Sequence, residues 1–257
     1  GFGKLGANPQ ALGIVRENMS RWPTEYHDRK GMLRKSNTFD DFINGCVCSL
    51  IRRYCPDLLL AYNCMIDSLR HRYGVFNDYV RQGLDMIDEW LGEIMEAMQE
   101  TGIAERTNFV ILSDHGQMDF QRRLKINTLL RRGGFLAVDE SGRLCDWQAF
   151  GQSNGMSATI FLRNPQDQRL SQRVLDYLQA LRDSGEGGFS SIYTVDEVKS
   201  RYGLYGNFSF VVETDGISAF ADAYTEPLES PMVLSDYRLG RATHGLSLIH
   251  ISEPTRL

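Results

Sequence analysis

Residues 108–118 read NFVILSDHGQM, so four apolar residues in a row stand directly before Ser-Asp-His. A short apolar run of this kind is typical of a strand buried on both faces of a parallel sheet. We therefore predict a strand over Phe109–Leu112, with Asp114 and His115 at its carboxyl end. Ligands of open α/β sheets lie outside the carboxyl ends of strands, and an adjacent carboxylate and imidazole can hold a cation there. A lone Asp-His pair, however, is more often a solvated turn with a capping aspartate.

A second apolar run, Leu58–Tyr62, is followed by Asp67 and His71, four positions apart. On a helical turn this spacing puts both side chains on one face, and on a compact loop it still brings both within reach of one ion. The pattern D-x-x-x-H is common by chance, and its simpler interpretation is a capping aspartate and a surface histidine. Its place just after a predicted buried strand, as for Asp114-His115, favours a site.

Residues 75–102 carry the clearest helical pattern in the chain. Apolar residues recur at intervals of four and three, at Val80, Leu84, Ile87, Leu91, Ile94 and Met98. Such a stripe predicts an amphipathic helix that packs on a sheet. With the strands over 58–62 and 109–112, it predicts one right-handed βαβ unit whose two polar ends lie at the same edge of the sheet.

The remaining pattern predicts an α/β protein with a strand-richer second half. Further helices are expected over 8–19, 38–54, 124–132, 170–181 and 195–202, a hairpin over 135–147, and strands over 157–162, 191–194, 208–213 and 217–220. We assign residues 1–120 to a metal-binding α/β core, 121–238 to an inserted subdomain with further core elements, and 239–245 to a return to the metal site.

Composition narrows the class of protein. The net charge of −5 and the absence of a basic face argue against binding of a nucleic-acid polymer. No apolar run reaches bilayer length, and no signal peptide is visible. The five cysteines lack C-x-x-C spacing, so we expect free thiols of a reducing compartment, with the cytoplasm preferred. The chain starts at Gly1 without a methionine, which leaves a leader peptide open.

The last residues of the sequence are expected to be foreign to the gene. Leu246–Arg256 read LSLIHISEPTR, the direct translation of a transposase sequencing adapter. We therefore treat 246–257, with His250, as a non-native tail and expect the genuine sequence to end at Gly245. The preceding Thr243-His244-Gly245 says little alone, but His244 is a candidate third ligand beside Asp67 and His71.

Taken in order, the D-x-x-x-H, S-D-H-G-Q-M and T-H-G motifs resemble the alkaline phosphatase superfamily, and in particular its nucleotide pyrophosphatase/phosphodiesterase-like branch. The resemblance covers residues 56–115 and 243–245. It implies a parallel sheet sandwiched by helices, with a smaller inserted α+β subdomain.

The resemblance also implies two divalent metal ions, usually zinc, with manganese as the alternative. Asp67, His71 and His244 would hold one ion, and Asp114 and His115 would belong to the other. Family members add an aspartate from the first strand and a threonine or serine nucleophile. We find neither motif before Asn63, so the catalytic nucleophile is expected to lie outside this chain and the fragment to be inactive.

The function implied is a metal-dependent hydrolase of phosphodiester or pyrophosphate bonds, with a small phosphorylated substrate such as a nucleotide. Phosphomutase-type isomerases, phosphatases and sulfatases of the same superfamily are alternatives, and the absent nucleophile would separate them. A catalytically dead domain that binds metal or phosphate is the non-enzymatic alternative, and an α/β domain whose polar strand ends are mere caps and turns is the simplest one.

Overall fold

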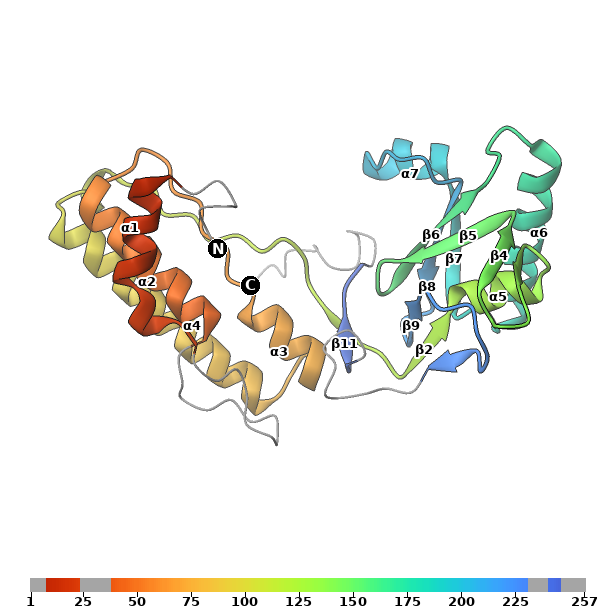
Figure 1. Cartoon of the computed structure of the whole chain (residues 1–257), viewed down its shortest axis with the longest axis horizontal. Coiled ribbons are helices and arrows are strands. Elements are labelled where there is room, and N and C mark those ends of the chain that lie inside the picture. Colours follow the sequence, from red (N-terminus) through yellow and green to blue (C-terminus); the bar gives the residue numbers. More distant parts are fainter. Residues whose placement is uncertain (1–7, 24–37, 231–239, 246–257) are drawn as a thin grey trace. The chain divides into compact units, whose positions relative to one another are not determined.

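The computed structural model describes residues 8–23, 38–230 and 240–245 (Figure 1). The chain divides into two compact units. We call residues 1–69 with 76–112 the helical unit, and residues 70–75 with 113–257 the sheet unit. The predicted tail, 246–257, lies outside the described residues, and the predicted domain boundaries at 120 and 238 stay predictions.

Among its described residues, the helical unit contains three complete α-helices, each begun by a capping side chain, and the first part of a fourth. Its α-helices are α1 (Pro9–Glu17), α2 (Phe39–Tyr54), the first part of α3 (Met65–Tyr73) and α4 (Asp78–Glu100), with short 3-10 turns η2 (Met19–Arg21) and η3 (Ala104–Arg106). Asn8, Thr38 and Asn77 accept hydrogen bonds from backbone N–H groups of the first turns of α1, α2 and α4. The helix expected over 75–102 is therefore confirmed, and it begins at Asp78 because Asn77 caps it.

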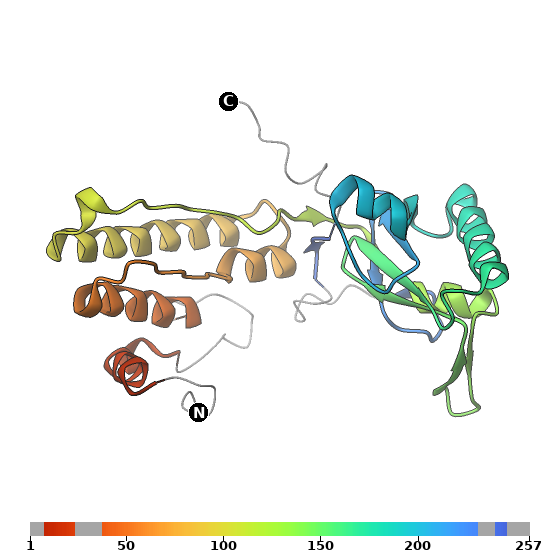
Figure 2. The same ribbon diagram turned by 90° about the horizontal axis from the view of Figure 1, so that it is seen from above.

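Helices α2 and α4 run side by side and share an apolar core (Figure 2). The buried side chains of this core are Val47, Cys48, Ile51, Ala97, Met98 and Ile103. Helix α4 is thus amphipathic as predicted, but its apolar side packs on helix α2 and not on a sheet, and Leu84 of the predicted stripe is 49% exposed.

Two predicted strands of the helical unit are wrong. Residues 58–62 and 109–112 are not strands in the described structure, and their apolar side chains lie largely in solvent, with Leu60 84% and Leu112 85% exposed. An apolar run indicates a demand for burial, but a strand forms only where a neighbouring strand takes up its backbone hydrogen bonds. No described residue pairs with either segment in a sheet, so the expected βαβ unit is not formed.

The sheet unit is built on a four-stranded antiparallel sheet in the order β5-β6-β8-β7. These strands are β5 (Ala149–Ser153), β6 (Ser157–Leu162), β7 (Phe189–Thr194) and β8 (Phe210–Thr214). Helices α5 (Ile126–Arg132) and α6 (Gln168–Ser184) contribute to the same core, and α7 (Val195–Tyr202) follows β7. The strand over 157–162 and the helix over 195–202 agree with the prediction residue for residue.

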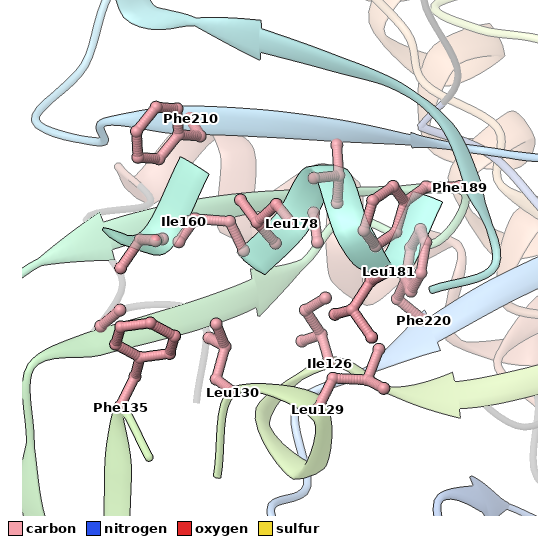
Figure 3. Packing of buried hydrophobic residues seen from close by; sticks show 14 of the residues in the cluster. Ile126, Leu129, Leu130, Phe135, Ile160, Leu178, Leu181, Phe189, Phe210 and Phe220 are labelled. Carbon is pink, nitrogen blue, oxygen red and sulfur yellow. The ribbon is translucent and has the colours of Figure 1, made fainter. Parts of the chain in front are cut away.

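One continuous core holds the sheet unit together (Figure 3). Leu129 and Leu130 of α5, Ile160 of β6 and Leu178 of α6 are at most 1% exposed. The rings of Phe189, Phe210 and Phe220 close the same cluster. Burial of such side chains is the main favourable contribution to folding, so this sheet is a rigid base for what it supports.

Smaller sheets complete the unit. A three-stranded sheet has the order β10-β2-β9, with β2 (Arg122–Lys125) parallel to β9 (Ser218–Ala221) and antiparallel to β10 (Glu229–Ser230). β3 (Leu136–Val138) and β4 (Leu144–Trp147) form the predicted hairpin. β1 (Met118–Asp119) pairs with β11 (Ala242–Thr243). This pairing brings the segment just after Asp114-His115 beside the segment just before His244. The mixed α/β class is confirmed.

None of the helices within the described ranges combines the length and the apolar character that a membrane crossing demands.

Candidate metal centre

Asp67 and His71 lie one turn apart on helix α3, so the helical alternative of the sequence prediction holds. Two side chains fix the start of this helix. The carboxylate of Asp40 accepts the backbone N–H of Cys64 at 2.9 Å, and the amide oxygen of Asn63 accepts the N–H of Met65 at 3.1 Å. The unit boundary falls within α3, but the helix is continuous, so it sets the relation of Asp67 to His71 by itself.

His71 is buried at the end of α3, with 7% of its surface exposed. Its Nδ1 lies 2.8 Å from the carbonyl oxygen of Ala242, and its own carbonyl oxygen accepts the N–H of Arg241 at 2.8 Å. A carbonyl oxygen only accepts, so Nδ1 of His71 carries the proton and Nε2 is the ring nitrogen that has a lone pair. Donation of the other ring N–H to a carbonyl is how metal-binding histidines are commonly oriented.

His244 follows β11, and its ring lies near the rings of both His71 and His115. Its ring centroid is 5.1 Å from that of His71, edge to face, and 3.9 Å from that of His115, stacked. The pairing of Thr243 with Met118 brings the two predicted motifs together, because Asp114 and His115 lie just before Met118. Three histidines that are 44 and 129 positions apart in sequence therefore meet in one cluster.

Asp67, His71 and His244 offer ligand atoms within 4.8 Å of one another. Two ligands of one tetrahedral zinc ion lie about 3.4 Å apart when each bond is about 2.1 Å long. An ion would therefore draw these atoms together by at most about 1.4 Å, which side-chain rotation can supply. One carboxylate and two imidazoles without a thiolate are a donor set that suits zinc.

Asp114 and His115 form a second pair of donors. Nε2 of His115 lies 3.5 Å from Oδ2 of Asp114, a separation that matches two ligands of one ion. Nδ1 of His115 lies 3.2 Å from the carbonyl oxygen of Gly116, which leaves Nε2 as the ligand atom in this ring too. Asp114 is half-exposed, and the ring of its neighbour His115 stacks on the ring of His244.

The sequence missed the groups that hold these ligands. The carbonyl oxygen of Ala242 orients His71, and Gly240 lies so close to His71 that a Cβ there would overlap its carbonyl oxygen. The carboxylate of Asp119 accepts the N–H of Val75 at 2.8 Å and ties the end of α3 to β1. Backbone carbonyls carry no sequence signal, and only the glycine could have been singled out.

Comparison with known proteins gives a family match over most of the chain. A family model described as "Type I phosphodiesterase / nucleotide pyrophosphatase" matches residues 9–245. Ectonucleotide pyrophosphatase/phosphodiesterase 1 of Saccharomyces cerevisiae is 26% identical over 113 residues, which are 41% of this chain and 15% of that protein. Venom phosphodiesterase 2 of Crotalus adamanteus is 33% identical over 61 residues, which are 24% of this chain and 8% of that protein.

Comparison with solved structures matches this chain to human ectonucleotide pyrophosphatase/phosphodiesterase 5, with a TM-score of 0.49 and 15% identity. The similarity covers 84% of this chain and 50% of that one. An inactive variant of the murine protein, solved in complex with AMP, has a TM-score of 0.48 and 13% identity, with 83% of this chain and 53% of that one covered. The chain therefore spans about half the length of these solved relatives.

Proposed function

Because the chain belongs to the type I phosphodiesterase/nucleotide pyrophosphatase family, we propose that it carries metal-binding residues of a hydrolase that cleaves phosphodiester or pyrophosphate bonds. The convergence of His71 and His115 on His244 is the observation that supports this proposal most. The proposed ligand sets use all three imidazoles, because one divalent ion would bind His71 and His244 and a second would bind His115.

The proposed ligand sets follow the two donor groups. Asp67, His71 and His244 would hold one divalent ion, and Asp114 and His115 would contribute to a second, with zinc favoured over manganese. Bound ions of this kind lower the pKa of a hydroxyl nucleophile and stabilise charge on phosphoryl oxygens. The nucleophile itself is assigned to no residue of this chain.

The residues present have a defined task in this proposal. Ala242 and Gly116 hold the proton of each ring on Nδ1, so that His71 and His115 present Nε2 toward an ion. Only neutral imidazole binds metal, so ion binding is expected to weaken in acid. We propose a small phosphorylated substrate such as a nucleotide. The five free thiols support a reducing compartment such as the cytoplasm, which stays a proposal.

The test is zinc stoichiometry and affinity, measured by calorimetry on the purified 257-residue chain at neutral pH. We expect at least one ion bound, with loss of binding in His71→Ala and weakened binding of a second ion in Asp114→Ala. Asp88→Ala is the control, because Asp88 is an exposed carboxylate on α4. A folded chain that binds no zinc, or a His71→Ala variant that binds like the wild type, would contradict the proposal.

A further inference from the structure

The turn between β5 and β6, residues 154–156, contacts the backbone of His244. The N–H of Met156 donates to the carbonyl oxygen of His244 at 2.8 Å. A Cβ at Gly155 would overlap the same carbonyl oxygen and would lie 2.6 Å from Oγ1 of Thr243. A Cβ at Gly245 would in turn overlap the carbonyl oxygen of Asn154. The two backbones therefore touch on both sides of the histidine.

The turn is itself firmly anchored in the sheet unit. The N–H of Phe220 in β9 donates to the carbonyl oxygen of Gly155 at 2.7 Å, and Oγ of Ser153 accepts the N–H of Gly155 at 3.1 Å. Met156 is fully buried, and Phe220 belongs to the core of the unit. The packed sheet therefore holds the turn in place, and the turn can hold the backbone of His244 in a fixed position.

We propose that Gly155 is a positioning residue for His244: its missing side chain lets the β5–β6 turn seat the His244 peptide so that the ring lies near those of both His71 and His115. Two independent contacts then fix His244, namely the β1–β11 pairing at Thr243 and the turn at Gly155. The inference rests on the proposed metal site for its consequence, but the seating of the ring is a property of the metal-free chain.

Any side chain at Gly155 has two effects that must be separated. Gly155 has φ +86°, a left-handed conformation that strains any residue with a Cβ. Gly216, in the same unit, has φ +90° and nothing within 4 Å of a Cβ. Gly216→Ala therefore reproduces the backbone strain without contact with His244 and is the matched control for Gly155→Ala.

The first measurement is the imidazole resonances of His244 in the metal-free chain, observed by NMR. Stacking on His115 at 3.9 Å places the His244 ring in the shielding region of its neighbour. We expect Gly155→Ala to shift these resonances and Gly216→Ala to leave them in place. Unchanged His244 resonances in Gly155→Ala would overturn the inference, whether or not the chain binds zinc.

The second measurement is zinc affinity by competition with a chromophoric chelator, together with the gain in melting temperature on adding zinc. Loss of a supporting contact around a metal ligand typically lowers affinity by about 10- to 100-fold. We expect a loss of that size in Gly155→Ala and at most a twofold change in Gly216→Ala. A merely structural role would lower the melting temperature equally with and without zinc.

The outcomes distinguish the inference from the proposed function. If the wild-type chain binds no zinc but the His244 resonances shift in Gly155→Ala, the proposed metal site is contradicted and the positioning role is supported. A wild-type chain that binds zinc, with the same affinity in Gly155→Ala, would overturn the positioning role and retain the site.

Discussion

Two apolar segments of similar character, Ser157–Leu162 in the sheet unit and residues 109–112 in the helical unit, meet opposite environments. Strand β6 is paired on both edges, with β5 and β8, and Ile160 is fully buried. In the other segment the exposed fractions rise from 45% at Phe109 to 85% at Leu112. Both sequences favour an extended backbone, but only β6 is paired with neighbouring strands and buried.

The difference shows what a strand requires beyond its own residues. Extended backbone exposes one N–H and one C=O per residue, and a sheet satisfies these groups only through a neighbour. β6 has neighbours supplied by residues 149–153 and 210–214, whereas the described residues offer none to 109–112. The residue types of a segment therefore favour a strand, but the strand forms only where the fold places another strand beside it.

Hydrogen exchange should give the largest contrast between the two segments. Amides of β6 are expected to exchange only through unfolding of the sheet unit, with a free energy near the 5–15 kcal/mol typical of a domain. Amides of 109–112 should exchange almost as in an unstructured peptide, about three or more orders of magnitude faster. Mass spectrometry on peptides covering each segment measures both in one experiment, and equal protection would show that 109–112 is paired in solution.

A matched pair of leucine truncations should give the next largest effect. Leu178→Ala removes a fully buried side chain from the sheet-unit core, at an expected cost of about 2–5 kcal/mol. Leu60→Ala makes the same chemical change at a side chain that is 84% exposed, and should change stability by less than about 0.5 kcal/mol.

Urea unfolding followed by circular dichroism measures both variants against the wild type. A cost at Leu60 comparable with that at Leu178 would mean that the apolar segments of the helical unit are buried in solution, and the contrast between the two units would fail.

Local signals explain which parts of the fold could be predicted. The helix α4 follows from its apolar spacing, a signal contained in the segment itself, and the cap at Asn77 sets its start at Asp78. The strand predicted over 157–162 is confirmed because β5 and β8 pair with it on both edges. The strands over 58–62 and 109–112 failed because pairing depends on residues far away, which an apolar run cannot report.

The candidate site divides in the same way. Asp67 and His71 follow from a spacing that one helical turn explains, and the residue types of Asp114, His115 and His244 mark them as donors. Their convergence is carried by β1–β11 pairing, and their orientation by the carbonyl of Ala242 and the turn at Gly155. These are backbone contacts between distant segments, so the residue types at these positions do not predict which segments will meet.

The smallest effect is expected at Asp40, which tests whether the helical unit has a dry interior despite its exposed segments. Burial raises the pKa of Asp40 above its ordinary value of 3.8, although its carboxylate accepts the N–H of Cys64. The native state then holds the proton more tightly than the unfolded state, so the free energy of unfolding falls as pH rises from below 3.8 through the raised pKa.

Asparagine keeps an acceptor oxygen for Cys64 but does not titrate. The stability of Asp40→Asn relative to wild type should therefore increase with pH across that window and then level off. The total increase should be smaller than the loss of stability in Leu178→Ala. Urea unfolding at several pH values measures it. A difference that does not vary with pH would mean that Asp40 is solvated in the native state.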